Sequence, residues 1–137
     1  MRKCQRGFTM MELMVVLVII GILAALVYPS YTGHVVKTRR AAAEAALLTL
    51  AANMETYYNQ NNSYAGATLA NVNSPTTTQD SFYTLSINTA TASTFTIRAV
   101  PVGTQATNDA ACGTLTYDQL GTKGITGSGN ALTCWGN

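Results

Sequence analysis

The chain has 137 residues, of which 47% are hydrophobic and only 10% are charged. That length leaves room for one domain beside a single membrane helix. Residues 8 to 137 contain five Lys/Arg against six Asp/Glu, a balance that gives no broad electrostatic reason to bind nucleic acid. The sequence has no Gly-rich phosphate loop and nothing that suggests a Ser/His/Asp arrangement, so we expect neither an enzyme nor a cofactor site.

A long apolar run follows a short basic segment at the start of the chain. Residues 13 to 27 contain no charged side chain. As a helix, residues 8 to 28 would be about 31 Å long at ~1.5 Å per residue, enough to cross the hydrocarbon core of a bilayer. The basic residues before the run favour a cytoplasmic start, with the rest of the chain across the membrane. Glu12 stands at the mouth of the run, where a charge is costly and needs a partner or a function.

The residues around Glu12 suggest what that partner is. A cut between Gly7 and Phe8 would leave an amino group four residues before Glu12, on the same helical face. This arrangement, with Thr9 after Phe8 and Pro29 just beyond the apolar run, resembles the processing signal of type IV prepilins. The resemblance implies that a prepilin peptidase cuts after Gly7 and methylates the amine of Phe8. It also implies that Glu12 faces the amine of a neighbouring subunit in a filament.

Two plainer interpretations stay open. A basic segment before an apolar core also describes a secretory signal peptide, but Ala24-Ala25-Leu26 places a bulky residue where such a cleavage site needs a small one. A single-span membrane anchor fits the length of the run, but an ordinary anchor has no use for Glu12.

Beyond the apolar run the helical pattern is interrupted and then resumes. Pro29 removes a backbone donor, so we expect a kink or local melting over residues 25 to 29. Apolar residues then recur at three- and four-residue steps and form one face that can be buried against a sheet. The members of this face are Val36, Ala43, Leu47, Leu50, Ala51, Met54 and Tyr58. Residues 59 to 63 favour turns and caps and end the helix.

The second half of the chain is typical of antiparallel strands. Residues 82 to 87 and 94 to 100 alternate in side-chain character, and residues 88 to 93 between them suit a hairpin loop. The positions predicted to face the core are Tyr83, Leu85, Ile87, Phe95, Ile97 and Ala99.

The remaining segments connect or extend this hairpin. Residues 65 to 80 show no period and are interpreted as a connecting loop. A third strand is predicted at residues 114 to 117. The glycines between 121 and 129 indicate a turn and then a flexible loop that returns to residues 132 to 135.

Cysteine placement predicts one disulfide. Cys4 lies in the segment that the predicted cut removes, so the mature chain keeps Cys112 and Cys134. Two cysteines in an exported domain most simply pair with each other. A zinc site would need more ligands than these two and the distant His34 can supply. The scattered aspartates lack the spacing of a calcium loop, so we expect no metal site.

These elements predict an α+β fold in which a long N-terminal helix packs on an antiparallel sheet of three or four strands. The resemblance names this the type IV pilin fold. It divides the chain into a leader peptide at residues 1 to 7, a transmembrane or filament-core helix at 8 to 28, and a periplasmic head at 29 to 137.

Several segments of the head also resemble minor pilins of the PilE type; they are residues 57 to 64, 99 to 101, 111 to 116, 119 to 124 and 134 to 135. The resemblance implies a structural subunit of a type IV pilus, a minor pilin that takes part in pilus assembly or initiation. The alternatives are a major pilin, a pseudopilin of a type II secretion system and, ranked lower, a DNA- or surface-binding pilin. DNA capture ranks low because the head beyond Tyr58 has only Arg98 and Lys123 as cations.

The same resemblance implies partners and a location. The partners are other pilins, the prepilin peptidase and methyltransferase, the inner-membrane assembly platform and, before assembly, the lipid bilayer; no strong signal for nucleic acid is expected. The protein would cross the bacterial inner membrane once, with its head in the periplasm, and would later belong to the extracellular pilus.

Overall fold

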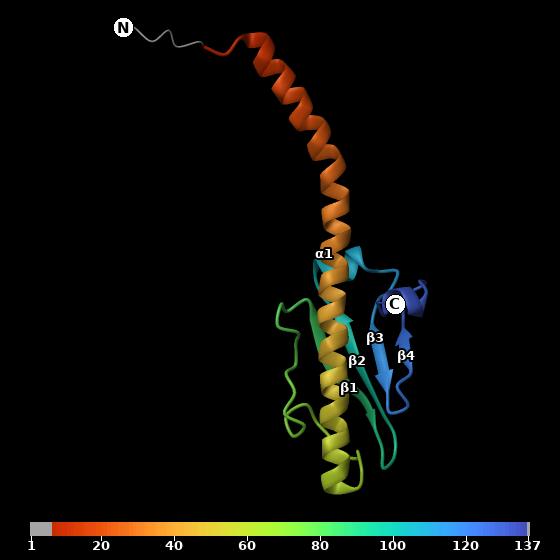
Figure 1. Cartoon of the computed structure of the whole chain (residues 1–137). Helices are drawn as coiled ribbons and strands as arrows, with labels where there is room; N and C mark the ends of the chain where they lie inside the picture. Colours follow the sequence, from red (N-terminus) through yellow and green to blue (C-terminus); the bar gives the residue numbers. More distant parts are fainter. Residues whose placement is uncertain (1–6, 137) are drawn as a thin grey trace, which may run out of the picture. The chain divides into compact units, whose positions relative to one another are not determined.

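The structure is a computed structural model that describes residues 7 to 136, without the side chains of residues 27 to 30. The predicted leader therefore lies outside the described residues, except for Gly7. The chain forms two compact units, Met1–Val35 and Val36–Asn137, which are described separately. One helix, α1 (Met10–Asn61), contributes to each of them (Figure 1).

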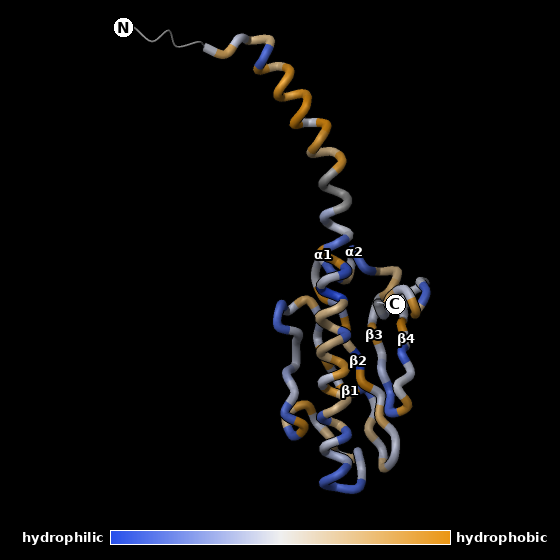
Figure 2. The backbone as a smooth tube through the Cα atoms, viewed as in Figure 1, coloured by the Kyte–Doolittle hydropathy of each residue, from blue (hydrophilic) through white to orange (hydrophobic). Residues whose placement is uncertain are grey.

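In the first unit, α1 presents apolar side chains to its surroundings on every face. An 18-residue window of this helix has a mean hydropathy of 2.8, and none of it is buried within the chain. Figure 2 shows this part of the helix as the longest continuous hydrophobic stretch. By length and composition it can cross a membrane. Because α1 is helical through residues 25 to 29, the expected alternative of local melting is wrong; the kink at Pro29 stays a prediction.

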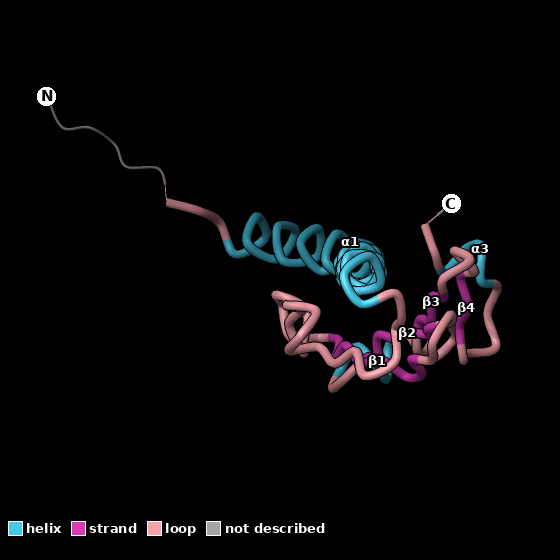
Figure 3. Tube along the Cα trace, turned by 90° about the horizontal axis from the view of Figure 1, so that it is seen from below, coloured by secondary structure: helices cyan, strands magenta, loops and turns pink. Residues whose placement is uncertain are grey.

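In the second unit, α1 buries the face that the sequence predicts. Ala43, Leu47, Leu50 and Met54 are fully buried, and Val36 and Ala51 nearly so. Their three- and four-residue spacing places these side chains on one side of the helix. Figures 1 and 3 show this half of α1 against the sheet, and its buried residues form one cluster with those of β1, β2 and β3. The predicted helix-on-sheet packing is therefore confirmed.

Four antiparallel strands form the sheet, in the order β1-β2-β3-β4 along the chain. They are β1 (Tyr83–Ala90), β2 (Phe95–Pro101), β3 (Leu115–Asp118) and β4 (Lys123–Ile125). The β1–β2 hairpin turns more tightly than expected, because Thr91 N–H donates to the Thr94 carbonyl and β1 continues to Ala90. A bulge between Ile87 and Thr89 absorbs the resulting shift in register.

The fourth strand corrects the start of the flexible loop that was predicted from Gly124 to Gly129, because β4 includes Gly124. Gly124 pairs with Thr116, and Lys123 pairs with Tyr117. A side chain on Gly124 would overlap the hydroxyl of Thr116, so the absence of a Cβ lets the two strands meet. Gly124 therefore allows β3 and β4 to pair and does not mark a flexible loop.

Two short helices, α2 (Thr104–Asn108) and α3 (Ala131–Cys134), are also absent from the prediction. Each is too short to show a helical period in the sequence. The side chain of Asn130 caps α3 by accepting a hydrogen bond from Leu132 N–H at 2.8 Å. The local signal for α3 was therefore a cap and not a periodic pattern.

The predicted disulfide between Cys112 and Cys134 is confirmed, with the two Cα atoms 5.6 Å apart. A closed loop with a sequence separation of 22 stabilises the fold by about 3 kcal/mol in the chain-entropy model. Trp135 follows the second cysteine and is 3% exposed. Its ring lies 6.0 Å from that of Tyr117, and its Nε1–H donates to the Gly124 carbonyl. The disulfide and Trp135 together hold the C-terminal residues against β3 and β4.

The core lies between α1 and the inner face of β1 to β3. Five of the six strand positions predicted to face it are buried; the sixth, Ile87, is partly buried and packs against the core. Tyr64, just after α1, fills the end of the core, where its ring meets that of Phe95 at 4.9 Å and that of Tyr58 at 4.6 Å. Residues 65 to 80 form turns with one isolated bridge, Thr77 to Thr84, so the predicted connecting loop is confirmed.

Candidate functional site

The start of α1 carries a capping arrangement around Glu12. Thr9 precedes the first helical residue, and its hydroxyl accepts a hydrogen bond from Glu12 N–H at 3.2 Å. Thr followed three residues later by Glu is the sequence of a capping box. Glu12 also stands in the first turn, where the positive end of the helix dipole favours a carboxylate. The helix start thus stabilises the Glu12 charge before any second chain is present.

The cap is a signal that the sequence interpretation overlooked, although the Thr-x-x-Glu spacing could have revealed it. The predicted cleavage residues lie just ahead of it. Gly7 and Phe8 precede the helix and are exposed, with Phe8 at 77%. Exposed, non-helical backbone is accessible to a peptidase. The cut, the methylation of Phe8 and the pairing of its amine with Glu12 stay predictions.

The apolar surface beyond Glu12 is large and continuous. Between Leu13 and Leu26 the large aliphatic side chains are 41% to 69% exposed. Soluble monomers seldom expose so much contiguous apolar area. Such a surface is typical of a site that contacts a membrane or another protein. This surface is the part of the described chain best suited to bind lipid or other apolar helices.

A buried polar network joins three elements of the head. The Arg40 guanidinium donates two hydrogen bonds to the Asp109 carboxylate, at 2.9 and 2.7 Å. Tyr83 Oη–H donates to the same carboxylate at 3.0 Å, and Gln105 Nε2 lies 3.2 Å from it. Gln105 also donates to the Val36 carbonyl. Because Asp109 is 3% exposed, these donors replace the water that its charge would otherwise need.

This network fastens α2 and the residue after it to α1 and β1. Burial raises the pKa of Tyr83 to about 12, and the negative charge of Asp109 contributes to the same shift. The sequence interpretation noted Arg40 close to the apolar stripe but did not pair it with Asp109. The two residues are 69 positions apart, and no motif in one sequence connects them.

The outer face of the sheet carries hydroxyl groups and one cation. Because Ile97 and Ala99 face the core, Arg98 points to the opposite side of β2. The strand register places Arg98 in one row between Ser86 and Thr116. Arg98 is exposed, and its Nε–H donates to Ser86 Oγ at 2.9 Å, which leaves the terminal guanidinium nitrogens for a phosphate or carboxylate.

The other cations of the head are less available or lie elsewhere. Arg40 is bound to Asp109. Arg39 stacks over the ring of Phe82 at 3.4 Å, and the ammonium of Lys123 lies 5.4 Å from the centre of the Trp135 ring. Lys37 is exposed on α1. An anion that binds the sheet face therefore meets Arg98 first.

Two carboxyl groups near the sheet titrate differently. Burial raises the pKa of Glu44, although the charges of Lys123 and Arg40 oppose that shift. Burial would raise the pKa of Asp118 too, but the hydrogen bonds that its carboxylate accepts from Thr122 and Leu120 outweigh burial and lower it. Asp118 thus keeps its charge at the end of β3, in the turn towards β4.

Comparison with known proteins assigns the chain to a recognised family. A family model described as type IV minor pilin ComP, DNA uptake sequence receptor, matches residues 29–116. A second, described as the prokaryotic N-terminal methylation motif, matches residues 2–28. The two matches confirm the type IV pilin family and its minor class. The first names the ComP type, where the sequence interpretation named the PilE type, and it counts against the low rank given to DNA binding.

Individual relatives match over shorter stretches. The type II secretion system core protein G of Pectobacterium carotovorum subsp. carotovorum is 43% identical over 60 residues, 44% of this chain and 38% of the relative. A fimbrial protein of Pseudomonas aeruginosa is 48% identical over 52 residues, 36% of this chain and 34% of the relative. The chain thus spans about two fifths or less of the length of these two curated relatives.

The fold itself matches a solved structure. The Neisseria meningitidis non-core minor pilin PilV superposes with a TM-score of 0.55 at 24% identity, over 69% of this chain and 89% of that one. The predicted α+β pilin fold is therefore confirmed. The pilin families consist of structural and not enzymatic proteins, which agrees with the expectation that this chain is no enzyme.

Proposed function

Because this chain belongs to the family of the type IV minor pilin ComP, the DNA uptake sequence receptor, we propose that it is a minor subunit of a type IV pilus whose head receives DNA. The observation that carries this proposal is the family match over residues 29–116, which contain most of the head. The low cation count argued for an assembly role alone, but the exposed Arg98 still supplies one cation on the sheet face for a weak phosphate contact.

The N-terminal unit supplies the filament part of this function. We place the leader at residues 1 to 7, the core helix at 8 to 28 and the head at 29 to 137. Cleavage after Gly7 releases the amine of Phe8 beside Glu12, and methylation modifies it. Glu12 stands in the first turn of the helix, where the helix dipole favours a negative charge. The apolar side chains of the helix lie in the inner membrane before assembly and against neighbouring helices afterwards.

The head supplies the DNA contact through the outer face of its sheet. Arg98 binds a backbone phosphate there, with the hydroxyls of Ser86 and Thr116 in the same row as further donors. One or two phosphate contacts predict weak binding whose logarithm falls with the logarithm of salt concentration at a slope of about −1 to −2. The sequence preference in the family name requires base contacts in addition.

The test measures DNA binding by the full chain in detergent over a range of salt concentrations. We expect Arg98→Gln to weaken binding to all sequences and to reduce the salt slope by about 1. Lys37→Gln is the matched control, since it removes an exposed cation of α1 outside the sheet face. Unchanged binding by Arg98→Gln would move the contact to another face. If the unsubstituted protein bound no DNA at low salt, the receptor role would be refuted.

The second candidate is a minor pilin that only assembles or primes the filament. It is favoured by the charge of the head, because residues 29 to 137 contain five Lys/Arg and five Asp/Glu, which balance each other. Quantitative mass spectrometry of sheared pili tests the shared part of both candidates. We expect a low copy number, a start at methylated Phe8 and an intact Cys112–Cys134 bond; a dominant copy number would identify a major pilin.

A further inference from the structure

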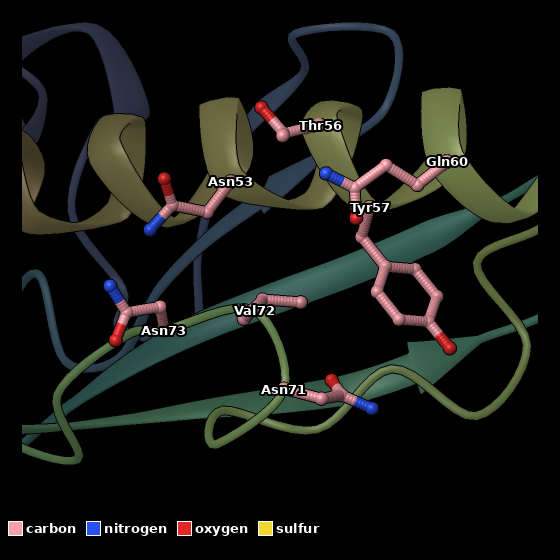
Figure 4. A pocket seen from close by; sticks show the side chains of 7 residues that line it. All are labelled: Asn53, Thr56, Tyr57, Gln60, Asn71, Val72 and Asn73. Atoms are coloured by element: carbon pink, nitrogen blue, oxygen red, sulfur yellow. The ribbon is translucent and has the colours of Figure 1, made fainter.

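Beside the last turns of α1, the head contains a hollow to which neither the filament role nor the DNA role assigns a function. It has a volume of about 270 Å³ and lies between the last turns of α1 and the connecting loop. Its lining residues are Asn53, Thr56, Tyr57, Gln60, Asn71, Val72 and Asn73. Figure 4 shows the four helix residues on one side of the hollow and the three loop residues on the other. Four of the seven carry a carboxamide, and none is charged.

Three of these amides have unused hydrogen-bonding capacity. Within residues 7 to 136, the side chains of Asn53, Gln60 and Asn73 make no hydrogen bond to the protein. Each offers two N–H donors and a carbonyl acceptor. Asn71 differs, because its amide already accepts from Thr68 N–H at 2.6 Å and donates to the Gly66 carbonyl at 3.0 Å. The hollow therefore combines one structural amide with three that are free to bind.

The loop wall is held in place before any ligand arrives. Thr68 and Asn71 cap each other's backbone N–H groups, and Ser74 N–H donates to the Leu69 carbonyl. Val72 is 5% exposed and anchors the loop in the core. Asn73 has a φ of 51°, which asparagine tolerates better than most residues. A fixed wall lowers the entropic cost of binding.

We propose that this hollow binds a neutral saccharide. Sugar hydroxyls both donate and accept hydrogen bonds, and carboxamides do the same. Tyr57 and Val72 supply an apolar wall for the C–H face of a sugar ring. The volume lies just below the range of about 300–1,000 Å³ for ligand pockets, so it admits one sugar ring with the rest of a chain outside. The absence of any cation among the lining residues disfavours a phosphate backbone.

The test uses the full chain in a detergent without a sugar headgroup. Neutral hexoses and N-acetylhexosamines are titrated while the side-chain amide signals of asparagine and glutamine are followed by NMR. We expect saturable shifts for Asn53, Gln60 and Asn73 alone. Gln60→Ala, or Asn73→Gly, which keeps the positive φ accessible, should weaken binding about tenfold, the loss of about one hydrogen bond.

Asn59→Ala is the matched control, since Asn59 is an exposed amide of the same helix that does not line the hollow. It should leave the affinity unchanged. If Asn59→Ala weakened binding as much as Gln60→Ala, the site would lie elsewhere and the proposal would fail. Shifts of the same amides with short DNA and none with any sugar would assign the hollow to a nucleobase instead. No shift with any probe would also overturn the proposal.

Discussion

The two halves of α1 are continuous in sequence, yet they meet opposite surroundings. Leu17 in the first half is 61% exposed, whereas Leu47 in the second is fully buried against the sheet. The second half finds its apolar partner within the same chain. The first half has none among the described residues, and water is a poor solvent for it. The second half of α1 therefore completes the core of the head. The first half presents an apolar surface that needs a bilayer or other subunits to cover it.

The largest expected effect comes from a substitution that impairs the filament role of the first half of α1 and leaves the second half unchanged. Glu12→Ala removes the one acidic group of the apolar segment, so a docked neighbour would bury its amine without a partner. We expect incorporation into pili to be nearly abolished, while cleavage after Gly7 and the stability of the head stay unchanged. Immunoblots of sheared pili and of membranes measure this; normal incorporation would refute the pairing.

The next largest effect comes from a substitution that destabilises the packing of the second half of α1 in the head and leaves the first half unchanged. Asp109→Ala leaves the Arg40 guanidinium, which is 12% exposed, without its carboxylate. Such a change typically lowers the free energy of unfolding by about 3–5 kcal/mol. Denaturant unfolding of the full chain in detergent measures it. The double variant Arg40→Met/Asp109→Leu is the control and should recover part of the loss, because Tyr83 and Gln105 still lose the carboxylate to which they donate. No recovery would mean that these two hydrogen bonds outweigh the ion pair.

A matched pair of substitutions sharpens the comparison most directly. Leu47→Ala opens a cavity in the core and should lower the free energy of unfolding by about 2–5 kcal/mol. Leu17→Ala should leave the unfolding of the head unchanged and weaken packing in the filament instead. Denaturant unfolding and the pilus fraction are measured for both. Equal losses in the unfolding assay would show that the two halves are not independent.

The smallest effect concerns alkaline pH and belongs to the head alone. Burial raises the pKa of Tyr83 and of Tyr64 from 10.0 to about 12, and Glu55, which accepts a hydrogen bond from Tyr64, adds to the second shift. Because the folded pKa is raised, this contribution to stability is complete below pH 10.0 and is lost as pH rises through about 12.

Unfolding free energies measured across this alkaline window test the prediction. Tyr83→Phe should make the decline with pH shallower, because it removes one of the two titrating groups. Tyr117→Phe is a suitable control, since that ring is only partly buried beside Trp135. An unchanged slope for Tyr83→Phe would contradict the assignment of the loss to this hydroxyl.

Much of the architecture was predictable because it depends on short-range patterns. The apolar stripe from Val36 to Met54 and the alternation in β1 and β2 follow from the helical and strand periods. These periods place apolar side chains on one face, which can be buried against a neighbouring apolar surface. The roles of Gly7, Phe8 and Glu12 were predicted from their spacing along one segment, and they stay predictions. In the disulfide, two cysteines left only one pairing to consider.

The predictions that missed β4 and ranked DNA binding low failed for reasons that can be named. β4 has three residues with glycine at its centre, and its strand pairing depends on Thr116 lying opposite. DNA binding ranked low because Lys and Arg were counted along the chain, whereas the sheet register decides that Arg98 stands between Ser86 and Thr116 on an open face.

The sequence by itself determined the apolar segment, the charge at its mouth, the amphipathic helix and the main strands, because each depends on residues a few positions apart. Only the tertiary structure decided that Arg40 meets Asp109 and that Asn53 and Asn73 line one hollow, because packing joins positions that no local period relates. Short-range order is encoded in spacing, whereas contacts between distant residues exist only once the helix has docked on its sheet.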